Sequence, residues 1–220
     1  MQELQYPFDA AWILKNRKKI KKALLADGTT RFEKRIAVLG GSTTNDIVSI
    51  LELFLLNMGI APKFYQSEYA QYWQDAMFPN PELEAFAPDL IFIHTTTRNI
   101  TAFPKDLSAS KEEVDAALEQ QFQHFTQMWE RIQSVYHCPI IQNNFELPLF
   151  RLLGNSEASN PHGTVNFITR LNCKFYEYAQ SHTDFYIHDI NYLSACYGLD
   201  AWSDPSYCCL LYTSDAADEL

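Results

Sequence analysis

The sequence lacks the features that would place it in or across a membrane. None of its apolar runs approaches the roughly 20 residues that a spanning helix needs. The amino terminus also lacks the charged start and apolar core of a secretory signal peptide. We therefore expect a cytoplasmic protein without a membrane span.

Cationic residues are scarce as well. The 220 residues include 17 Lys and Arg against 27 Asp and Glu, which gives a formal net charge of -10 at pH 7. A nucleic-acid groove needs clustered Lys and Arg, so this composition argues against a nucleic-acid partner. The one basic run, from Lys15 to Lys22, is expected to be the solvent-exposed face of an N-terminal helix.

The cysteines show neither a metal-binding nor a disulfide pattern. Three of the five, Cys138, Cys173 and Cys196, stand singly within apolar or aromatic stretches, without the paired spacing of a zinc site. We expect these three to be small buried thiols. The sequence indicates no metal site of its own.

Short apolar runs alternate with amphipathic stretches along most of the chain. Strands are expected at 35–39, 62–65, 89–93, 139–142 and 185–188, and helices at 10–25, 44–57, 110–136 and 165–180. The segments 68–77 and 81–86 are expected to be short helical or irregular pieces. Strands that alternate with helices form parallel sheets covered on both faces. The sequence therefore predicts an α/β fold, a three-layer sandwich with a parallel sheet of about five strands.

The segment from Ile36 to Thr44 is the most informative, because an apolar strand runs into a Gly-Gly turn, three hydroxyl residues and a helix. Glycines let the backbone approach a ligand closely, and the helix start presents unpaired N–H groups and a positive dipole end. This places Ser42 as a nucleophile or a binding hydroxyl, flanked by Gly41 and Thr43. The alternative is an ordinary turn with a Ser or Thr N-cap.

Other polar side chains follow the later strands. They are Arg98 and Asn99 after the third strand, Asn143 and Asn144 after the fourth, and Asp189 and Asp204 after the fifth. Parallel sheets bind ligands at the carboxyl ends of their strands, so we expect these residues to converge with Ser42. Arg98 could clamp a carboxylate or phosphate, and the amide of Asn99 could donate to an oxyanion.

A serine nucleophile also needs a base within hydrogen-bond reach. A serine directly after the first strand resembles the SGNH hydrolases, in which a late Asp-x-x-His motif supplies the other catalytic residues. Asp204-Pro205-Ser206-Tyr207 stands where that motif belongs, with tyrosine in place of histidine. The resemblance implies a catalytic role for Asp204, and His162 is a candidate substitute base. That family's glycine after the second strand is missing, and Gln71 or Tyr72 stands near its place.

A closer resemblance extends over residues 31–207. The pieces that carry it are Leu39 to Thr44, Tyr69 to Tyr72, Phe86 to Leu90, Ile141 to Phe145 and Gly198 to Pro205. Together they resemble the amino-terminal domain of FkbH-like proteins, which join an SGNH-like domain to a haloacid-dehalogenase domain of subfamily IIIC. Such proteins resemble phosphatases and, in polyketide pathways, load a glyceryl unit from a phosphoglycerate onto a carrier protein.

The resemblance sets expectations for domains and cofactors. It implies a helical extension at 1–30 and an SGNH-like domain at 31–207. The haloacid-dehalogenase motif Asp-x-Asp-x-Thr is absent, so Mg²⁺ is expected only in a domain beyond this sequence. Residues 208–220 are similar to translated sequencing-adapter tails and are expected to be non-native, with a genuine disordered acidic tail as the alternative.

Three functions are consistent with these observations. The first is an accessory domain of a hydrolase or transferase that recognises an acyl, carrier-protein-linked or phosphorylated small substrate, with its own haloacid-dehalogenase domain as partner. The second is an active serine esterase or acyltransferase acting on cell-surface carbohydrate. The third is a phosphate- or nucleotide-binding module of flavodoxin-like shape that uses the Gly-Gly-Ser-Thr-Thr turn as an anion cradle.

Overall fold

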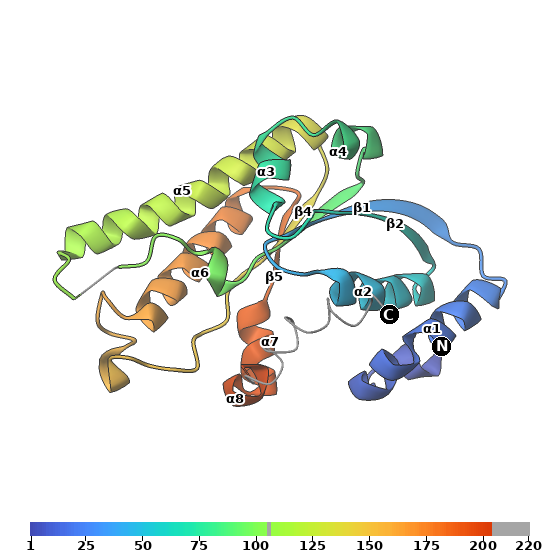
Figure 1. Ribbon diagram of the computed structural model, residues 1–220, viewed down its shortest axis with the longest axis horizontal. Helices are drawn as coiled ribbons and strands as arrows, with labels where there is room; N and C mark the ends of the chain where they lie inside the picture. Colours follow the sequence, from blue (N-terminus) through green and yellow to red (C-terminus); the bar gives the residue numbers. More distant parts are fainter. Residues whose placement is uncertain (105–106, 204–220) are drawn as a thin grey trace, which may run out of the picture. The chain divides into compact units, whose positions relative to one another are not determined.

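A five-stranded parallel sheet flanked by helices forms the fold of the protein (Figure 1). The computed structural model describes residues 1–104 and 107–203. The strands are β1 (Phe32–Gly40), β2 (Ile60–Gln66), β3 (Leu90–His94), β4 (Ile140–Asn143) and β5 (Phe185–His188). Their order in the sheet is β2-β1-β3-β4-β5, the flavodoxin-like order of doubly wound sheets. The α/β fold predicted from the alternation of strands and helices is confirmed.

The four long helices lie close to their predicted bounds, and the structure adds two short helices after the last strand, at 190–197 and 199–202, that were not predicted. The helices are α1 (Ala10–Ala26), α2 (Asn45–Asn57), α3 (Tyr72–Met77), α4 (Pro81–Phe86), α5 (Lys111–Tyr136), α6 (Thr164–Ser181), α7 (Ile190–Tyr197) and α8 (Leu199–Trp202), with short 3-10 helices η1 (Gln2–Leu4), η2 (Thr97–Asn99) and η3 (Gly154–Ser156). In the segment 68–77, predicted to be helical or irregular, the helix begins only at Tyr72, because Ala70 takes a left-handed conformation with φ of 58°.

The first strand is longer than predicted. It begins at Phe32 rather than at residue 35, because Phe32 to Lys34 pair with Ile60 to Pro62 of β2 although all three side chains are exposed. The prediction from apolar residues, 35–39, covers only the buried part of this strand. Periodicity carries little information where neither face of a strand is covered.

The chain forms two compact units. The first comprises residues 1–94 and 133–139, and the second comprises residues 95–132 and those from 140 onward. In the first unit α2 packs against β2, and α1 packs on α2. Asp9 starts α1 by accepting a hydrogen bond from the backbone N–H of Trp12 at 2.9 Å.

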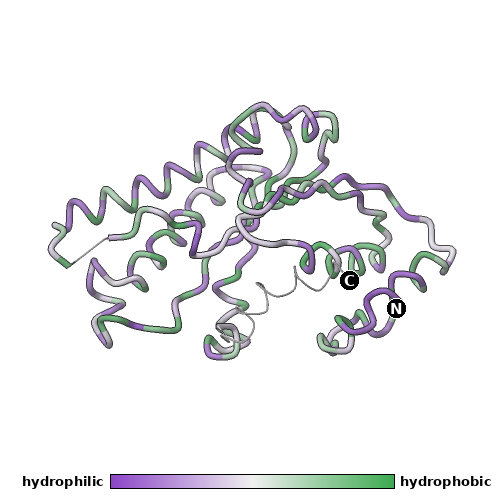
Figure 2. Tube along the Cα trace, in the orientation of Figure 1, coloured by the Kyte–Doolittle hydropathy of each residue, from purple (hydrophilic) through white to green (hydrophobic). Residues whose placement is uncertain are grey.

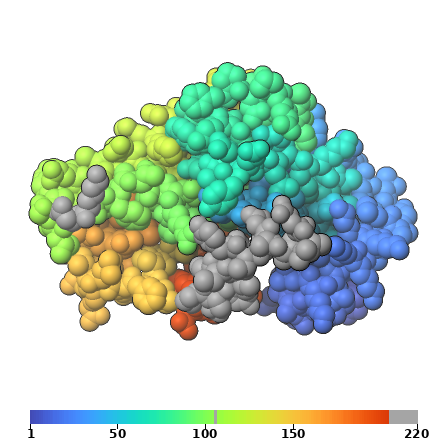
Figure 3. Space-filling view, in the orientation of Figure 1, coloured from blue at the N-terminus to red at the C-terminus, as the bar shows by residue number. Residues whose placement is uncertain are grey.

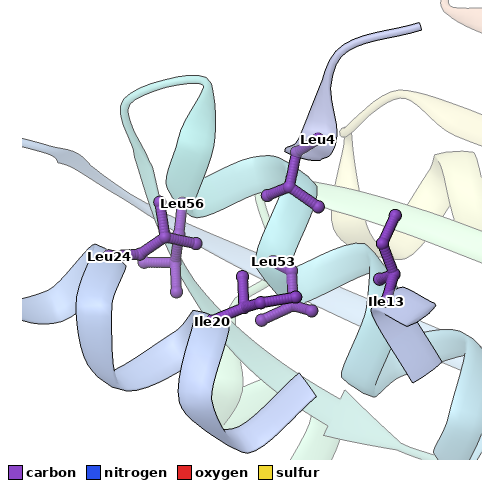
Figure 4. Packing of buried hydrophobic residues seen from close by; sticks show 6 residues of the cluster. All are labelled: Leu4, Ile13, Ile20, Leu24, Leu53 and Leu56. Atoms are coloured by element: carbon purple, nitrogen blue, oxygen red, sulfur yellow. The ribbon is translucent and has the colours of Figure 1, made fainter. Parts of the chain in front are cut away.

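The interface of α1 with α2 is a small apolar core of its own (Figure 4). Its buried members are Leu4, Ile13, Ile20, Leu24, Leu53 and Leu56. The contrast between the two helices is visible in Figure 2, where α2 is largely hydrophobic and α1 alternates hydrophilic and hydrophobic residues. An amphipathic helix thus covers part of an apolar one.

The second unit is built around aromatic side chains of α5 and α6. Trp129, Phe125 and Phe175 are fully buried and in ring contact, with centroids 4.8 to 5.9 Å apart. The indole N–H of Trp129 donates to the side-chain oxygen of Gln142 at 3.1 Å, which satisfies both buried groups.

The prediction for the cysteines is only partly right. Cys138 is buried, and burial raises the pKa of its thiol to about 11. Cys173 and Cys196 are exposed. In α6, Cys173 stands two residues from the buried Leu171 and Phe175, a spacing of 200° that turns it to the opposite helix face.

Within the described residues, no helix is both long and apolar enough to cross a membrane.

Candidate functional site

The turn from β1 into α2 is tight, and its geometry requires glycine at residue 40. A Cβ at this position would lie 2.7 Å from Cγ2 of Thr44 and 2.8 Å from the backbone oxygen of Ser42. Neither backbone nor packed side chain can yield that much without opening the turn. Gly40 therefore brings Ser42 and Thr44 close to the end of the strand.

The hydroxyl groups of this turn do not cap α2. Thr44 occupies the N-cap position but makes no side-chain capping bond. Its hydroxyl lies 3.4 Å from Oε1 of Gln66 at the end of β2. The Ser42 hydroxyl makes no hydrogen bond with any residue that the structure describes, and Ser42 is partly exposed. The alternative of a simple Ser or Thr N-cap does not describe this turn.

Backbone N–H donors lie beside the Ser42 hydroxyl. The Gly41 N–H donates to the carbonyl oxygen of His94 on β3 at 2.7 Å, so it is committed to the sheet. The N–H groups of Ser42 and Thr43 donate to no acceptor among the described residues. One turn therefore offers a hydroxyl and two N–H groups to an incoming oxygen atom, next to the N-terminus of a 13-residue helix.

The segment that follows β2 adds three further residues to the first unit. Gln71, predicted near this place, is exposed at the N-cap of α3. The neighbouring Tyr72 is buried, and its burial raises the pKa of the phenol to about 12. The hydroxyl oxygen of Ser67, directly after β2, is buried and has no hydrogen-bond partner among the described residues.

Asn143 and Asn144, in the second unit, are buried and bonded within the protein. Asn143 accepts from the Thr95 N–H at 2.7 Å and donates to the carbonyls of Thr95 and Asn144. Asn144 donates to the Tyr176 hydroxyl at 2.7 Å and to the Asp189 carboxylate at 2.6 Å. All four amide N–H donors are therefore used by the protein itself in this structure.

Arg98 and Asn99 lie on η2, also in the second unit. Asn99 forms a capping box with Thr96, whose N–H donates to the Asn99 side-chain oxygen at 2.8 Å. The Arg98 guanidinium is exposed and forms no ion pair within the described part of the chain. It remains available to an anion, as predicted for an arginine clamp.

The His162 ring is held by one partner from its own loop and one from the segment before α5. Its Nε2 lies 2.7 Å from the carbonyl oxygen of Ala109, and its Nδ1 lies 3.0 Å from Oδ1 of Asn160. Both ring nitrogens therefore have partners within the second unit. Asp204, predicted as a catalytic residue, lies outside the described residues.

Sequence reasoning missed three buried polar side chains that organise the loops of the second unit. Gln121 accepts from the N–H groups of Thr101 and Ala102, Asn172 bonds both backbone groups of Phe145, and Glu157 accepts from Leu153 and Thr164. A signal existed for the first two, because each interrupts the apolar stripe of a long helix. Nothing local marks Glu157, since it stands in the long polar loop.

Across residues 1–104 and 107–203, no group of three or more His, Cys, Asp or Glu side chains is placed to hold a metal ion.

Comparison with known families decides where this arrangement belongs. The model of the FkbH N-terminal domain matches residues 35–215. The chain belongs to this family. The match begins after α1, and it extends past residue 207 into the segment expected to be non-native, a boundary that stays a prediction.

Among solved structures, the FkbH-type fold is similar to the N-terminal part of the protein BF1531 from Bacteroides fragilis, described as containing a phosphatase domain complexed with Mg. The identity is 19% and the TM-score 0.69, over 83% of this chain and 47% of that one. The chain thus spans about half of that structure. A putative acylhydrolase from the same organism, BF3764, is 17% identical with a TM-score of 0.42, over 82% of this chain and 77% of that one. No curated protein matches the chain.

Proposed function

We propose that this FkbH N-terminal domain is a substrate-recognition domain of a biosynthetic hydrolase or transferase. Its ligand is the carbonyl or phosphoryl group of an acyl, carrier-protein-linked or phosphorylated small molecule. The observation that carries the proposal is the turn after β1, where the Ser42 hydroxyl and the N–H groups of Ser42 and Thr43 have no partner among the described residues.

The described surroundings of Ser42 support a proposal of binding rather than hydrolysis. A serine hydroxyl becomes a nucleophile when a base accepts its proton within hydrogen-bond distance. No described residue forms a hydrogen bond with the Ser42 hydroxyl. The same hydroxyl and N–H groups can bind an oxygen atom without breaking any bond of the protein, which is what a recognition site requires.

The proposal assigns the chemistry to a second, phosphatase-type domain that would use Mg²⁺. The BF1531 structure supports this assignment, because the fold shared with this chain occupies 47% of a longer protein described as containing a phosphatase domain. In this arrangement the domain described here selects and holds the substrate. The proposal also retains the cytoplasmic location expected from the sequence.

Calorimetry on Ser42→Ala tests the binding role. Acetyl-pantetheine and glycerol phosphate are titrated separately into the protein and its variants. We expect at least one to bind, and Ser42→Ala to weaken that binding about five- to tenfold, the effect of one lost hydrogen bond. Ser49→Ala is the matched control, because its hydroxyl donates to the Asp46 carbonyl within α2 and should leave affinity unchanged. No binding of either compound contradicts the proposal.

Hydrolysis of p-nitrophenyl acetate separates this function from that of a serine esterase. We expect the same rate for the protein and for Ser42→Ala, because no base among the described residues forms a hydrogen bond with the hydroxyl. A rate that Ser42→Ala abolishes would instead establish the esterase or acyltransferase function. A nucleotide-binding module would show heat with ATP, which we do not expect, because the sequence contains no Gly-x-x-x-x-Gly-Lys-Ser/Thr loop to hold the phosphates of a nucleotide.

A further inference from the structure

Helix α1 concentrates positive charge in an acidic protein. It contains no acidic residue and six of the 17 cationic ones: Lys15, Arg17, Lys18, Lys19, Lys21 and Lys22. Two of them are neutralised by α2, since Arg17 lies 3.3 Å from Asp46 and Lys21 lies 2.7 Å from Glu52. The surface of this helix is the dark blue part of the space-filling view (Figure 3).

The other four cations share one exposed face. Lys15, Lys18, Lys19 and Lys22 have the spacing i, i+3, i+4 and i+7, and all four are exposed. None of them forms an ion pair within the part of the chain that the structure describes. This lysine face points away from the buried side of α1, which contacts α2 (Figure 4).

Exposed leucines border the lysine face. Leu14 is 45% exposed and Leu25 is 59% exposed. A shallow hollow lies at the C-terminal end of the helix, lined by Lys18, Lys21, Lys22, Leu25 and Ala26. A surface that combines ammonium groups with apolar side chains matches a partner that combines carboxylates with apolar side chains.

We propose that the lysine face of α1 is a docking surface for an acidic protein partner, specifically an amphipathic helix that carries Asp or Glu beside Leu-type residues. The four unpaired ammonium groups attract its carboxylates, and Leu14 and Leu25 receive its apolar side chains. The face extends over two turns of helix, or about 10 Å, which a single partner helix can cover.

An anionic membrane fits the same helix less well. Interfacial helices insert their apolar face among the lipids and leave the cationic face toward the headgroups. In α1 the apolar face, formed by Ile13, Ile20 and Leu24, is already buried against α2. The lysines also occupy the centre of the exposed face, where insertion would have to begin.

Nucleic acid fits less well too. The cation that binds phosphate through two parallel hydrogen bonds is arginine. The one arginine of α1 is paired with Asp46, and the unpaired cations are all lysine.

This inference goes beyond the proposed function and does not depend on it. The family match begins at Arg35, so α1 lies outside the matched range. A domain that fails to bind substrate at Ser42 could still dock a partner through α1. The two proposals therefore need separate variants.

The test measures fluorescence anisotropy of a labelled synthetic helix of about five turns, with Glu on one face and Leu beside it. A second peptide has Gln in place of each Glu. The protein is compared with a variant carrying Lys15→Glu, Lys18→Glu, Lys19→Glu and Lys22→Glu, and with the charge-preserving variant that has Arg at the same positions. Circular dichroism confirms that each variant keeps its helix content.

We expect the acidic peptide to bind and the Gln peptide not to bind. The Glu variant should weaken binding at least about tenfold and the Arg variant less than about threefold, because the attraction depends on charge. Ser42→Ala should have no effect. Failure of the acidic peptide to bind, or equal affinity in the Glu variant, overturns the proposal. Tighter binding of a DNA duplex or of phosphatidylserine vesicles through the same lysines overturns it as well.

Discussion

Replacing Asn143 tests whether a buried amide holds the end of β4 to the segment that follows β3. Its side chain is 1% exposed and makes three hydrogen bonds. Oδ1 accepts from the Thr95 N–H at 2.7 Å, while Nδ2 donates to the Thr95 carbonyl at 2.7 Å and to the Asn144 carbonyl at 2.8 Å. Both backbone groups of Thr95 thus depend on one side chain.

The expected cost follows from these contacts. Asn143→Ala leaves one N–H and two carbonyl groups without this partner in a site that water does not reach. A buried polar group without a partner costs about 1–3 kcal/mol, and carbonyls are the less demanding of the two kinds. We therefore expect a loss of about 3–5 kcal/mol in unfolding free energy, a large part of the stability of an ordinary domain.

The isosteric Asn143→Asp separates hydrogen bonding from shape. The aspartate keeps one oxygen that accepts from the Thr95 N–H. Its second oxygen replaces the Asn143 Nδ2 donor and faces the carbonyl oxygens of Thr95 and Asn144. We expect it to destabilise the protein at least as much as Asn143→Ala, because a buried carboxylate without a cation is strongly unfavourable.

Urea denaturation of both variants measures these losses, and hydrogen exchange of the Thr95 amide reports the local opening. Asn166→Ala is the control, because that side chain makes one exposed bond to the Ala158 carbonyl and should cost no more than about 1 kcal/mol. A loss below about 1 kcal/mol for Asn143→Asp would refute the reasoning.

Three other substitutions have defined outcomes. Burial raises the pKa of the Glu146 carboxyl above its usual value of 4.5. The folded protein therefore holds this proton more tightly than the unfolded chain, and the unfolding free energy falls as the pH rises from 4.5 through the raised pKa. Glu146→Gln should remove this pH dependence and raise the Tm at pH 8. Gly40→Ala should open the turn, since its Cβ would lie 2.7 Å from Thr44, and calorimetry should show lost ligand binding even if the Tm changes little. The Leu53 side chain is 1% exposed and lies between α1 and α2. Leu53→Ala should lower the unfolding free energy measured by urea denaturation by about 2–5 kcal/mol. A loss below about 1 kcal/mol would contradict the packing in Figure 4.

Much of the fold was predictable because periodicity is local information. The strand Phe185–His188 was predicted at its exact bounds, and the long α5 within one residue, since an apolar stripe and the Ser110 capping residue mark it. The errors fall where burial does not follow from neighbours. Phe32 begins β1 although it is exposed, and Cys173 is exposed although aromatic residues surround it in sequence.

The candidate site was less predictable. The sequence located the Ser42 turn, because Gly-Gly between a strand and a helix has few structural uses. It could not show that the side-chain N–H groups of Asn143 and Asn144 donate to Thr95, Tyr176 and Asp189, because these partners are distant in the chain. It also could not distinguish a capping hydroxyl from a free one.

The sequence by itself determined the succession of strands and helices along the chain, the place of the Ser42 turn and the charge of α1. Each of these depends on residues that are neighbours in the sequence. Only the tertiary structure decided which polar groups are already satisfied. Asn143 and Ser42 are both polar residues at strand ends. Asn143 is buried with three hydrogen bonds, whereas the Ser42 hydroxyl bonds to no residue that the structure describes. That difference is set by what packs against each side chain.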